Sequence, residues 1–397
     1  MARSYGANAS LLLKRETAYG SQASGDYVRM PFNRCSLGSE QGLIDDPVLG
    51  QGRDPLSPLR DVINDEGDIV IPVDPRYLGF WLTGLFGDPT SATVAATGTI
   101  DFAANPADGD TITLNGTTWT FVTGIPAGNE TQIQATATQT IDQLVTDLNA
   151  SADANLVEAT YGRPASTQKL LVTLAGGGYD HVFASGAQDI PSYTVEVGQP
   201  EVPAFFVHTG VKLDSIALEF QRSGAAAMTV SAIAQGETRF AASQGGTPTT
   251  LAFSRISQFQ GAIKQGGNPV ANLTGGSLTY ANTLEKIETI RSDGRIEGAD
   301  PTIAALTGRI DVRFADTTLI DLATSGTAVD LEFGYTINAG LKAVFAAHEV
   351  YLPKPKLAVE GPGGVQASFD FHGAKNDAAG RMLTVTLTND LDGTQYA

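Results

Sequence analysis

Residues 329–337, VDLEFGYTI, alternate apolar and polar side chains without a break. In an extended chain the odd-numbered apolar residues fall on one side, and the residues between them fall on the other. A period of two is typical of a strand with one buried and one wetted face. Residues 306–314, LTGRIDVRF, repeat the pattern, so this part of the chain is predicted to form antiparallel sheet.

The composition extends this prediction to the rest of the chain. The 397 residues include 44 glycines and 42% apolar residues, a mixture that favours strands joined by tight turns over a helical protein. A chain of this length exceeds one ordinary core, so more than one domain is expected. The predicted fold class is mainly β, or α+β where helices cover a sheet.

The charge argues against several classes of partner. Lys and Arg number 25 against 43 acidic residues, a formal charge of −18, so the surface repels phosphate and gives no basis for gripping nucleic acid or anionic lipid. Cys35 is the only cysteine, so no intrachain disulfide can form. Residues 11–13 are leucines, too short a run for a signal-peptide core, and no stretch has the length of a membrane span. We therefore expect no secretion signal and no membrane insertion.

Two helices are expected among the strands. Residues 74–87 have Asp74 as N-cap, Pro75 in the first turn and Gly87 as the stop signal. The apolar stripe of this helix needs a sheet to pack on; it consists of Tyr77, Leu78, Trp81, Leu82, Leu85 and Phe86. Residues 316–326 predict a shorter helix, capped by Asp316 and packed through Leu319, Ile320, Leu322 and Ala323.

A long polar segment separates two early strands. Residues 26–37 alternate loosely and residues 68–73 form an apolar run, both typical of strands. Between them, residues 38–67 are rich in Pro, Gly and Asp, too polar and interrupted for a core. We expect a long projecting loop here, and such loops in compact domains are usually functional or disordered.

Residues 94–178 have the composition and pattern of an inserted domain. They are acidic, with only Arg163 and Lys169 as basic residues. Residues 111–122 predict a hairpin on an Asn-Gly turn, with one apolar face made of Ile112, Leu114, Trp119 and Phe121. A helix follows, with Thr140 and Gln143 as a capping box and Ile141, Leu144, Val145 and Leu148 at helical spacing. With a closing strand at 168–174, before three glycines, these elements predict a small α+β unit with its own core.

No motif for catalysis or cofactor binding is found in the sequence. The four histidines, His181, His208, His348 and His372, lie in different predicted strands or loops, which favours structural roles. Cys35 lies in a predicted strand without a basic partner, which argues against a nucleophile. The acidic pairs Asp45-Asp46 and Asp108-Gly109-Asp110 lack the spacing of an EF-hand loop, so turn formation is favoured over calcium binding. We expect a non-enzymatic protein without cofactor or metal.

A series of short motifs, in this order along the chain, resembles the major tail tube proteins of long-tailed bacteriophages. Before the insert they are ETAYG at 16–20, YVRMP at 27–31 and GFWLTGLFGDP at 79–89. After the insert they are DHVF at 180–183, PSYTVE at 191–196, GVKLDS at 210–215, YANTLE at 280–285, GPGGV at 361–365 and LTND at 387–390. The resemblance covers the chain outside the insert, and the order of the motifs carries it.

The resemblance implies a discontinuous tail tube domain, residues 1–93 and 179–397, folded as a β-sandwich with one or two flanking helices. It implies six copies closing into a ring whose inner sheets form a barrel, and rings stacking into the tube through which DNA leaves the capsid. The chain would be a virion protein of the phage tail, made in the cytoplasm of the bacterial host. Its partners would be further copies of itself and the tape measure, tail terminator and tail tip proteins, with DNA passing through the lumen unbound. An acidic lumen agrees with this role, because it avoids phosphate contacts that would hold the DNA.

Two sets of site residues follow from the resemblance. The polar segment 38–67 would contact the adjacent ring, through Asp45, Asp46, Arg53, Asp54, Arg60, Asp61, Asp65 and Glu66. Polar residues that alternate with core residues in strands would line the lumen, with Ser215, Glu219, Gln221, Thr229 and Ser231 as candidates. The insert has no role in closing a barrel, so we expect it on the outer surface of the tube.

Two other classes of protein stay open at this point. A head decoration or minor tail protein would be another virion component, and a bacterial surface adhesin or layer protein would share the acidic, β-rich composition. The adhesin interpretation lacks a secretion signal and internal repeats. Polymerisation into hollow rods would distinguish a tube protein from both, whereas calcium-dependent binding would favour the adhesin.

Overall fold

The computed structural model describes residues 3–46, 48–49, 53–357 and 361–396. The chain divides into two compact units. The larger comprises Met1–Thr90, His181–Asn389 and Gly393–Ala397, and the smaller comprises Ser91–Asp180 and Asp390–Asp392. The limits of the insert drawn from the sequence are 94 and 178.

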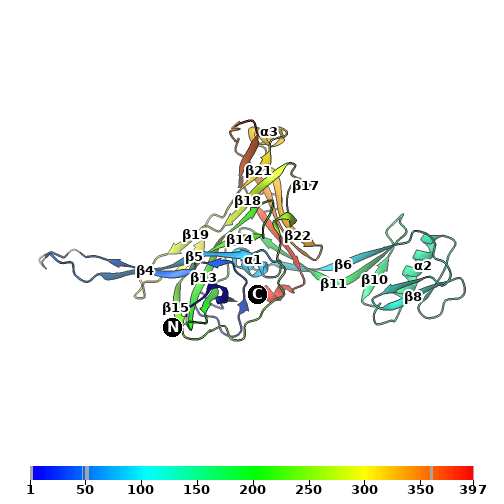
Figure 1. The fold of residues 1–397 in the computed structure, drawn as a ribbon, viewed down its shortest axis with the longest axis horizontal. Helices are drawn as coiled ribbons and strands as arrows, with labels where there is room; N and C mark the ends of the chain where they lie inside the picture. The colour runs from blue at the N-terminus through cyan, green and yellow to red at the C-terminus, as the bar shows by residue number, and fades with distance from the viewer. Residues whose placement is uncertain (1–2, 47, 50–52, 358–360, 397) are drawn as a thin grey trace. The chain divides into compact units, whose positions relative to one another are not determined.

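The larger unit is built mostly of antiparallel strands, so the predicted mainly-β class is confirmed (Figure 1). Before the insert its strands are β1 (Ser10–Arg15), β2 (Val28–Arg29), β3 (Arg34–Cys35), β4 (Gly38–Ile44) and β5 (Leu59–Pro72). After the insert they are β12 (Tyr193–Gln199), β13 (Ala204–Phe220), β14 (Ala227–Ala234), β15 (Gly236–Phe240), β16 (Gly261–Gln265), β17 (Asn268–Pro269), β18 (Leu273–Ala281), β19 (Leu284–Ile287), β20 (Gly298–Pro301), β21 (Ala305–Arg313), β22 (Val329–Asn338), β23 (Leu341–Tyr351), β24 (Gln366–Gly373) and β25 (Leu383–Asn389). The helices of this unit are α1 (Leu78–Phe86) and α3 (Thr318–Ser325), with short 3-10 turns at Gly6–Asn8, Gln258–Gln260 and Gly393–Tyr396.

Two layers of sheet enclose an aromatic core. The first layer, which we call the long sheet, runs in the order β5, β14, β13, β18, β21, β24. The second layer runs β16, β22, β23, β25. The ring of Phe333 on β22 lies 5.6 Å from that of Phe220 on β13 and 5.7 Å from that of Phe371 on β24. These rings join the two layers, which is the packing of a β-sandwich.

The strongest sequence patterns correspond to strands of this sandwich. The alternating stretches at 306–314 and 329–337 become β21 and β22, and the apolar residues of β22 are buried from Val329 to Tyr335. The loosely alternating stretch at 26–37 gives only the two short strands β2 and β3. The helix predicted at 316–326 is α3, where Asp316 accepts the N–H of Thr318 at 3.0 Å. Of its packing residues only Ala323 is fully buried, so this helix lies at the periphery.

Helix α1 lies inside the unit rather than on its surface. All nine of its residues are buried, so the prediction of a single apolar stripe is wrong for this helix. Glycines and threonine occupy the remaining face, and small side chains allow β13 and the C-terminal turn to approach closely. The helix begins at Leu78, later than expected, but Asp74 still caps the preceding turn by accepting the N–H of Arg76 at 2.8 Å. Gly87 ends it with a φ of 82°.

The predicted loop at 38–67 is mostly a β-hairpin. Strands β4 and β5 pair from Gly38 opposite Glu66 to Ile44 opposite Leu59, with a register shift between Gln41 and Leu43. Their outer residues are exposed on both faces, so no apolar alternation marks them in the sequence. Residues 47 and 50–52 of the predicted loop lie outside the described residues. The segment between the two strands is therefore much shorter than the sequence predicted.

The smaller unit folds around its own hydrophobic core. Its elements are β6 (Thr90–Asp101), β7 (Thr111–Leu114), β8 (Thr117–Val122), β9 (Glu130–Gln132), α2 (Ala137–Asn149), β10 (Ala159–Gly162) and β11 (Lys169–Ala184). The first residue of β6 and the last four of β11 belong to the larger unit. The Asn-Gly hairpin is present: Asn115 and Gly116 have φ angles of 45° and 85°, and Ile112 pairs with Trp119. The core residues are Leu114, Trp119, Phe121, Leu144, Leu148, Leu156, Tyr161 and Leu170.

Two details of this unit differ from the sequence-based expectation. Helix α2 begins at Ala137 and is capped by Thr136, whose hydroxyl accepts the N–H of Gln139, so Thr140 does not begin the helix. Thr140 is buried within the first turns instead. The closing strand continues through the three glycines as β11, because glycine tolerates the close neighbour Ala96 where a Cβ at Gly177 would collide.

Candidate assembly surfaces

The long sheet has one apolar and one polar face. The apolar face turns toward the core and includes Ile69, Ile71, Ile216, Leu218, Met228, Val230, Leu278, Tyr280, Leu306, Ile310, Phe369 and Phe371. The residues between them form the opposite surface, which we call the polar face; it includes Asp68, Val70, Ser215, Ala217, Glu219, Thr229, Ser231, Ser277, Thr279, Thr307, Arg309, Asp311, Ser368, Asp370 and His372. Small hydroxyl and acidic side chains dominate it.

Strand register aligns these side chains in rows across the sheet. Residues directly opposite each other on neighbouring antiparallel strands point to the same face. One row runs Val70, Thr229, Ala217, Thr279, Thr307, His372. The next runs Glu219, Ser277, Arg309, Asp370. The polar face is therefore continuous over six strands, and among the named residues of these two rows Val70 and Ala217 are the apolar side chains.

The charged groups on the polar face are partly neutralised by one another. Arg309 forms an ion pair with Asp311 at 3.0 Å, and Asp311 also accepts the hydroxyl of Ser368. Asp68 accepts the hydroxyl of Ser231 at 2.6 Å. Carboxylates outnumber guanidinium groups, so the face has little capacity to hold phosphate.

The predicted lumen residues fall on or beside this face. Ser215, Glu219, Thr229 and Ser231 lie on it, and Ser215 is directly opposite Ser231. Gln221 follows the last residue of β13, and its amide donates to Glu219 Oε2 at 3.0 Å. The register thus brings together four of the five candidates. The wider set on β18, β21 and β24 was missed, although the same alternation at 305–313 could have identified it.

Strand β24 borders the polar face with an open edge. Its residues 366–372 pair with β21 on one side. On the other side only the end of the strand, at His372 and Gly373, pairs with β23 among the described residues. A strand edge of this kind presents backbone N–H and C=O groups that can pair with another chain.

The β4–β5 hairpin presents most of the predicted stacking residues to solvent. Asp45, Asp46, Arg53, Asp54, Arg60 and Asp61 are exposed. Glu66 is half-exposed and forms an ion pair with Lys286 at 2.8 Å. Several apolar side chains accompany these charges and were not predicted; they are Leu43, Ile44, Val48, Leu49, Leu56, Leu59 and Val62.

Asp65 differs from the other predicted stacking residues. Its side chain is fully buried, and its carboxylate oxygen Oδ1 lies within hydrogen-bonding distance of His208 Nδ1, at 2.9 Å. The second ring nitrogen of His208 lies 3.9 Å from Glu237 Oε2. Asp65 shares the phase of Ile69 and Ile71 in β5, which was the sequence signal for its burial. We therefore do not retain it as a stacking residue.

The described residues contain no group of three or more His, Cys, Asp or Glu side chains placed to hold a metal ion. Burial raises the pKa of the half-buried Cys35 thiol, which disfavours the reactive thiolate. His181 contacts Asn389 Oδ1 at 3.2 Å and His348 contacts Thr384 Oγ1 at 2.7 Å. These partners are those of structural histidines.

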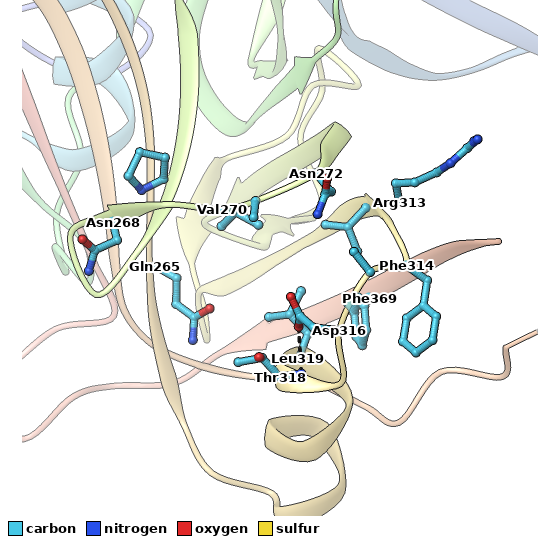
Figure 2. A pocket seen from close by; sticks show the side chains of 14 residues that line it. Gln265, Asn268, Val270, Asn272, Arg313, Phe314, Asp316, Thr318, Leu319 and Phe369 are labelled. Atoms are coloured by element: carbon cyan, nitrogen blue, oxygen red, sulfur yellow. Dashed lines mark hydrogen bonds between the residues drawn. The ribbon is translucent and has the colours of Figure 1, made fainter. Parts of the chain in front are cut away.

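One hollow of about 230 Å³ lies between the β16–β17 turn, the end of β21 and the start of α3 (Figure 2). Figure 2 shows the amides of Gln265, Asn268 and Asn272 around it, with Asp316 near its floor. The Asp316 carboxylate is occupied in capping α3. No nucleophile and base are paired among the lining residues, so the hollow does not have the arrangement of an acid–base catalytic site.

The family model described as "Phage tail tube protein" matches residues 6–373. The chain belongs to this family. The recognition made from the motif order is thereby confirmed, and so is the assignment of the chain as a structural, viral tail protein. No curated protein matches the sequence.

Family membership gives the polar face and the hairpin a context. A tail tube protein assembles with copies of itself and with other tail proteins in the virion. Among the residues that the structure describes, no helix is long and apolar enough to cross a membrane. The features of this chain are thus best interpreted as surfaces for assembly.

Proposed function

We propose that this tail tube protein forms hexameric rings that stack into the conduit for DNA ejection, with the polar face of the long sheet lining the lumen. The observation that carries the proposal is the continuous polar face over six strands. Its role is structural rather than enzymatic. Synthesis in the host cytoplasm and contacts with tape measure, tail terminator and tail tip proteins belong to the same proposal.

A lumen for DNA must not retain phosphate. Each phosphate neutralised by Lys or Arg adds salt-dependent affinity. On the polar face the guanidinium of Arg309 is already paired with Asp311, and neutral hydroxyls supply most of the remaining polar groups. Arg313 shares the phase of Arg309 at the end of β21 and is a second guanidinium on this face. The polar face as a whole is wetted and poor in cations, which suits fast passage of DNA.

The open edge of β24 supports the proposal of ring closure. Residues 366–371 have partners on one side only among the described residues. Pairing of this edge with the long sheet of a neighbouring copy would extend the sheet around the ring and cover an aggregation-prone edge. Closure in this way keeps the polar face on a single side of the combined sheet.

The hairpin supports contact between successive rings. Its outer residues are exposed on both faces, so in a single copy they stabilise no core. Exposed apolar side chains such as Leu43 and Leu59 are costly in a soluble monomer and typical of an interaction site. The stacking candidates retained are Asp45, Asp46, Arg53, Asp54, Arg60, Asp61 and Glu66.

The smaller unit is proposed to decorate the outside of the tube. Its core residues come from within the unit, so it can fold without contributing strands to a barrel. We expect that replacing residues 94–178 with a short Asn-Gly turn leaves tube assembly intact. Loss of tubes from such a well-folded variant would place the unit in the assembly interface instead.

Negative-stain electron microscopy of the concentrated protein tests the proposed function. Rings or tubes with a central hole are the expected result, and a variant with residues 45–58 replaced by a two-residue turn should give rings but no long tubes. Long tubes from the shortened variant would show that the hairpin is not required for the stacking of rings. Monomers under all conditions, including with the tail tip complex added, would contradict the tube role.

A further inference from the structure

A groove in the larger unit combines apolar walls with two arginines. It has a volume of about 390 Å³, and its lining includes Phe32, Tyr77, Phe253, Arg29 and Arg255 but no carboxylate. Phe253 is 47% exposed. Neither guanidinium forms an ion pair with a described residue. In a chain with a formal charge of −18, such a surface favours an acidic partner with apolar side chains.

The outer end of the β4–β5 hairpin has the complementary chemistry. Asp45 and Asp46 follow directly after Leu43 and Ile44, and all four are exposed. Leu59 lies opposite Ile44 in the hairpin register and is 58% exposed. Two carboxylates next to a small apolar patch match two guanidinium groups that lack an ion pair among the described residues and lie next to aromatic walls.

The hairpin cannot reach the groove of its own chain. Pro72, the last residue of β5, lines the groove, and Leu59, the first, lies at the outer end of the hairpin. Strands rise about 3.3 Å per residue, so β5 holds the two surfaces roughly 40 Å apart. Because β4 and β14 pair with β5 along its length, the strand is a stiff spacer. A hairpin end that enters this groove must therefore come from a second copy.

We propose that the groove lined by Arg29 and Arg255 receives the outer end of the β4–β5 hairpin from the next copy along the tube. Asp45 and Asp46 meet the two arginines, and Leu43 and Ile44 cover the apolar wall. Each copy carries both surfaces at opposite ends of one strand. Such a contact is heterologous, and it repeats in one direction into an open-ended stack. The inference rests on the proposed tube function and adds the surface that the hairpin binds.

Reciprocal charge reversal tests the contact. The variants are Arg29→Glu with Arg255→Glu, Asp45→Arg with Asp46→Arg, and all four changes in one chain. Each double variant should raise the protein concentration needed for tube formation by about tenfold or more, because like charges then oppose each other in the interface. The fourfold variant should return to within a few-fold of the wild type, since its reversed charges attract again.

The controls separate this inference from the tube function. Arg222→Glu changes an exposed arginine outside the groove and should assemble like the wild type. If wild-type tubes form and both double variants assemble equally well, the docking proposal is overturned while the tube function stands. Failure of the fourfold variant to recover, with its circular dichroism unchanged, also overturns it. A wild-type protein that never assembles would contradict both the docking proposal and the tube function.

Disulfide trapping gives a second measurement that does not depend on charge. In a Cys35→Ser background, Asp46→Cys combined with Arg255→Cys should give a ladder of crosslinked multimers when assembled protein is oxidised. Asp46→Cys combined with Arg222→Cys is the matched control and should stay monomeric on a denaturing gel. A monomer band alone from the first pair, in tubes seen by microscopy, would contradict the contact.

Discussion

At the residue scale, the buried carboxylate of Glu16 is a structural centre that the sequence did not reveal. It accepts hydrogen bonds from Ser192 Oγ at 2.7 Å and Thr194 Oγ1 at 3.0 Å, and from two backbone N–H groups, those of Gly20 and Gly210. These donors come from segments far apart in the chain. One side chain therefore links the end of the N-terminal strand to β12, its preceding residue Ser192, and the middle of β13 at Gly210.

Replacing Glu16 by Ala should destabilise the larger unit. Donors that remain buried without an acceptor cost free energy, so we expect the free energy of unfolding to fall by about 2–4 kcal/mol. Urea denaturation followed by tryptophan fluorescence measures this, since Trp81 is buried in the same unit. Ser21→Ala, a change at an exposed neighbour, is the control; an equal loss in both variants would refute the role of Glu16.

The pH dependence of the same site has a defined sign. Burial raises the pKa of Glu16 above its ordinary value of 4.5, although the hydrogen bonds oppose the shift. A raised folded-state pKa means that the folded state binds the proton of Glu16 more tightly than the unfolded state does. Protonation of Glu16 therefore stabilises the fold. This stabilisation is complete below the unfolded pKa and is lost as pH rises through the folded pKa. The stability of the wild type relative to Glu16→Gln should therefore improve on acidification from pH 7 toward pH 4. A flat difference across this range would contradict it.

The His208–Asp65 pair gives a second prediction at this scale. His208→Leu leaves the Asp65 carboxylate buried without its partner, so we expect a loss of about 3–5 kcal/mol in unfolding free energy. Combining it with Asp65→Leu removes the buried charge and should recover most of that loss. Denaturant unfolding of both variants decides the matter, and a double variant as unstable as the single one would show that packing, not charge, governs the site.

At the element scale, the sequence predicts those elements whose own residues create a pattern. Strand β22 alternates because one face meets the core, and the Asn115-Gly116 turn is marked by the positive φ angles it requires. The β4–β5 hairpin was missed because its outer residues are exposed on both faces, so nothing in the chain imposes a period of two. The His208–Asp65 pair joins residues 143 positions apart, and only the fold brings them together.

The start of helix α2 provides a test at this scale. Thr136→Ala removes the hydroxyl that accepts the N–H of Gln139, and loss of an N-cap costs about 1 kcal/mol. Thr146→Ala makes the same chemical change inside the helix, where the hydroxyl donates only to the carbonyl of Asp142, and should be neutral or slightly stabilising. Hydrogen exchange of the α2 amides measures both. Equal protection in the two variants would place the helix start elsewhere.

At the scale of the whole molecule, the candidate site is a sheet face rather than a cluster. Alternation in single strands identifies the residues whose side chains point away from the core, such as Ser215 and Thr229. Which strands adjoin each other depends on the topology, and the row from Val70 to His372 spans residues from both sides of the insert. The sequence therefore predicted part of the polar face but not its extent.

Added cations on the polar face should slow the passage of DNA if this face lines the lumen. Thr229 and Ser277 are part of it and carry no charge, so Thr229→Lys with Ser277→Lys adds two cations per subunit without removing an ion pair. Each phosphate that a lysine neutralises adds about 0.9 to the slope of log affinity against log salt. DNA release from assembled virions should then be slower at low salt and approach the wild-type rate as salt is raised.

The matched variant Thr229→Asn with Ser277→Asn has similar polarity without charge and should release DNA like the wild type. A salt-independent rate in the lysine variant, with intact tubes, would place the polar face outside the bore.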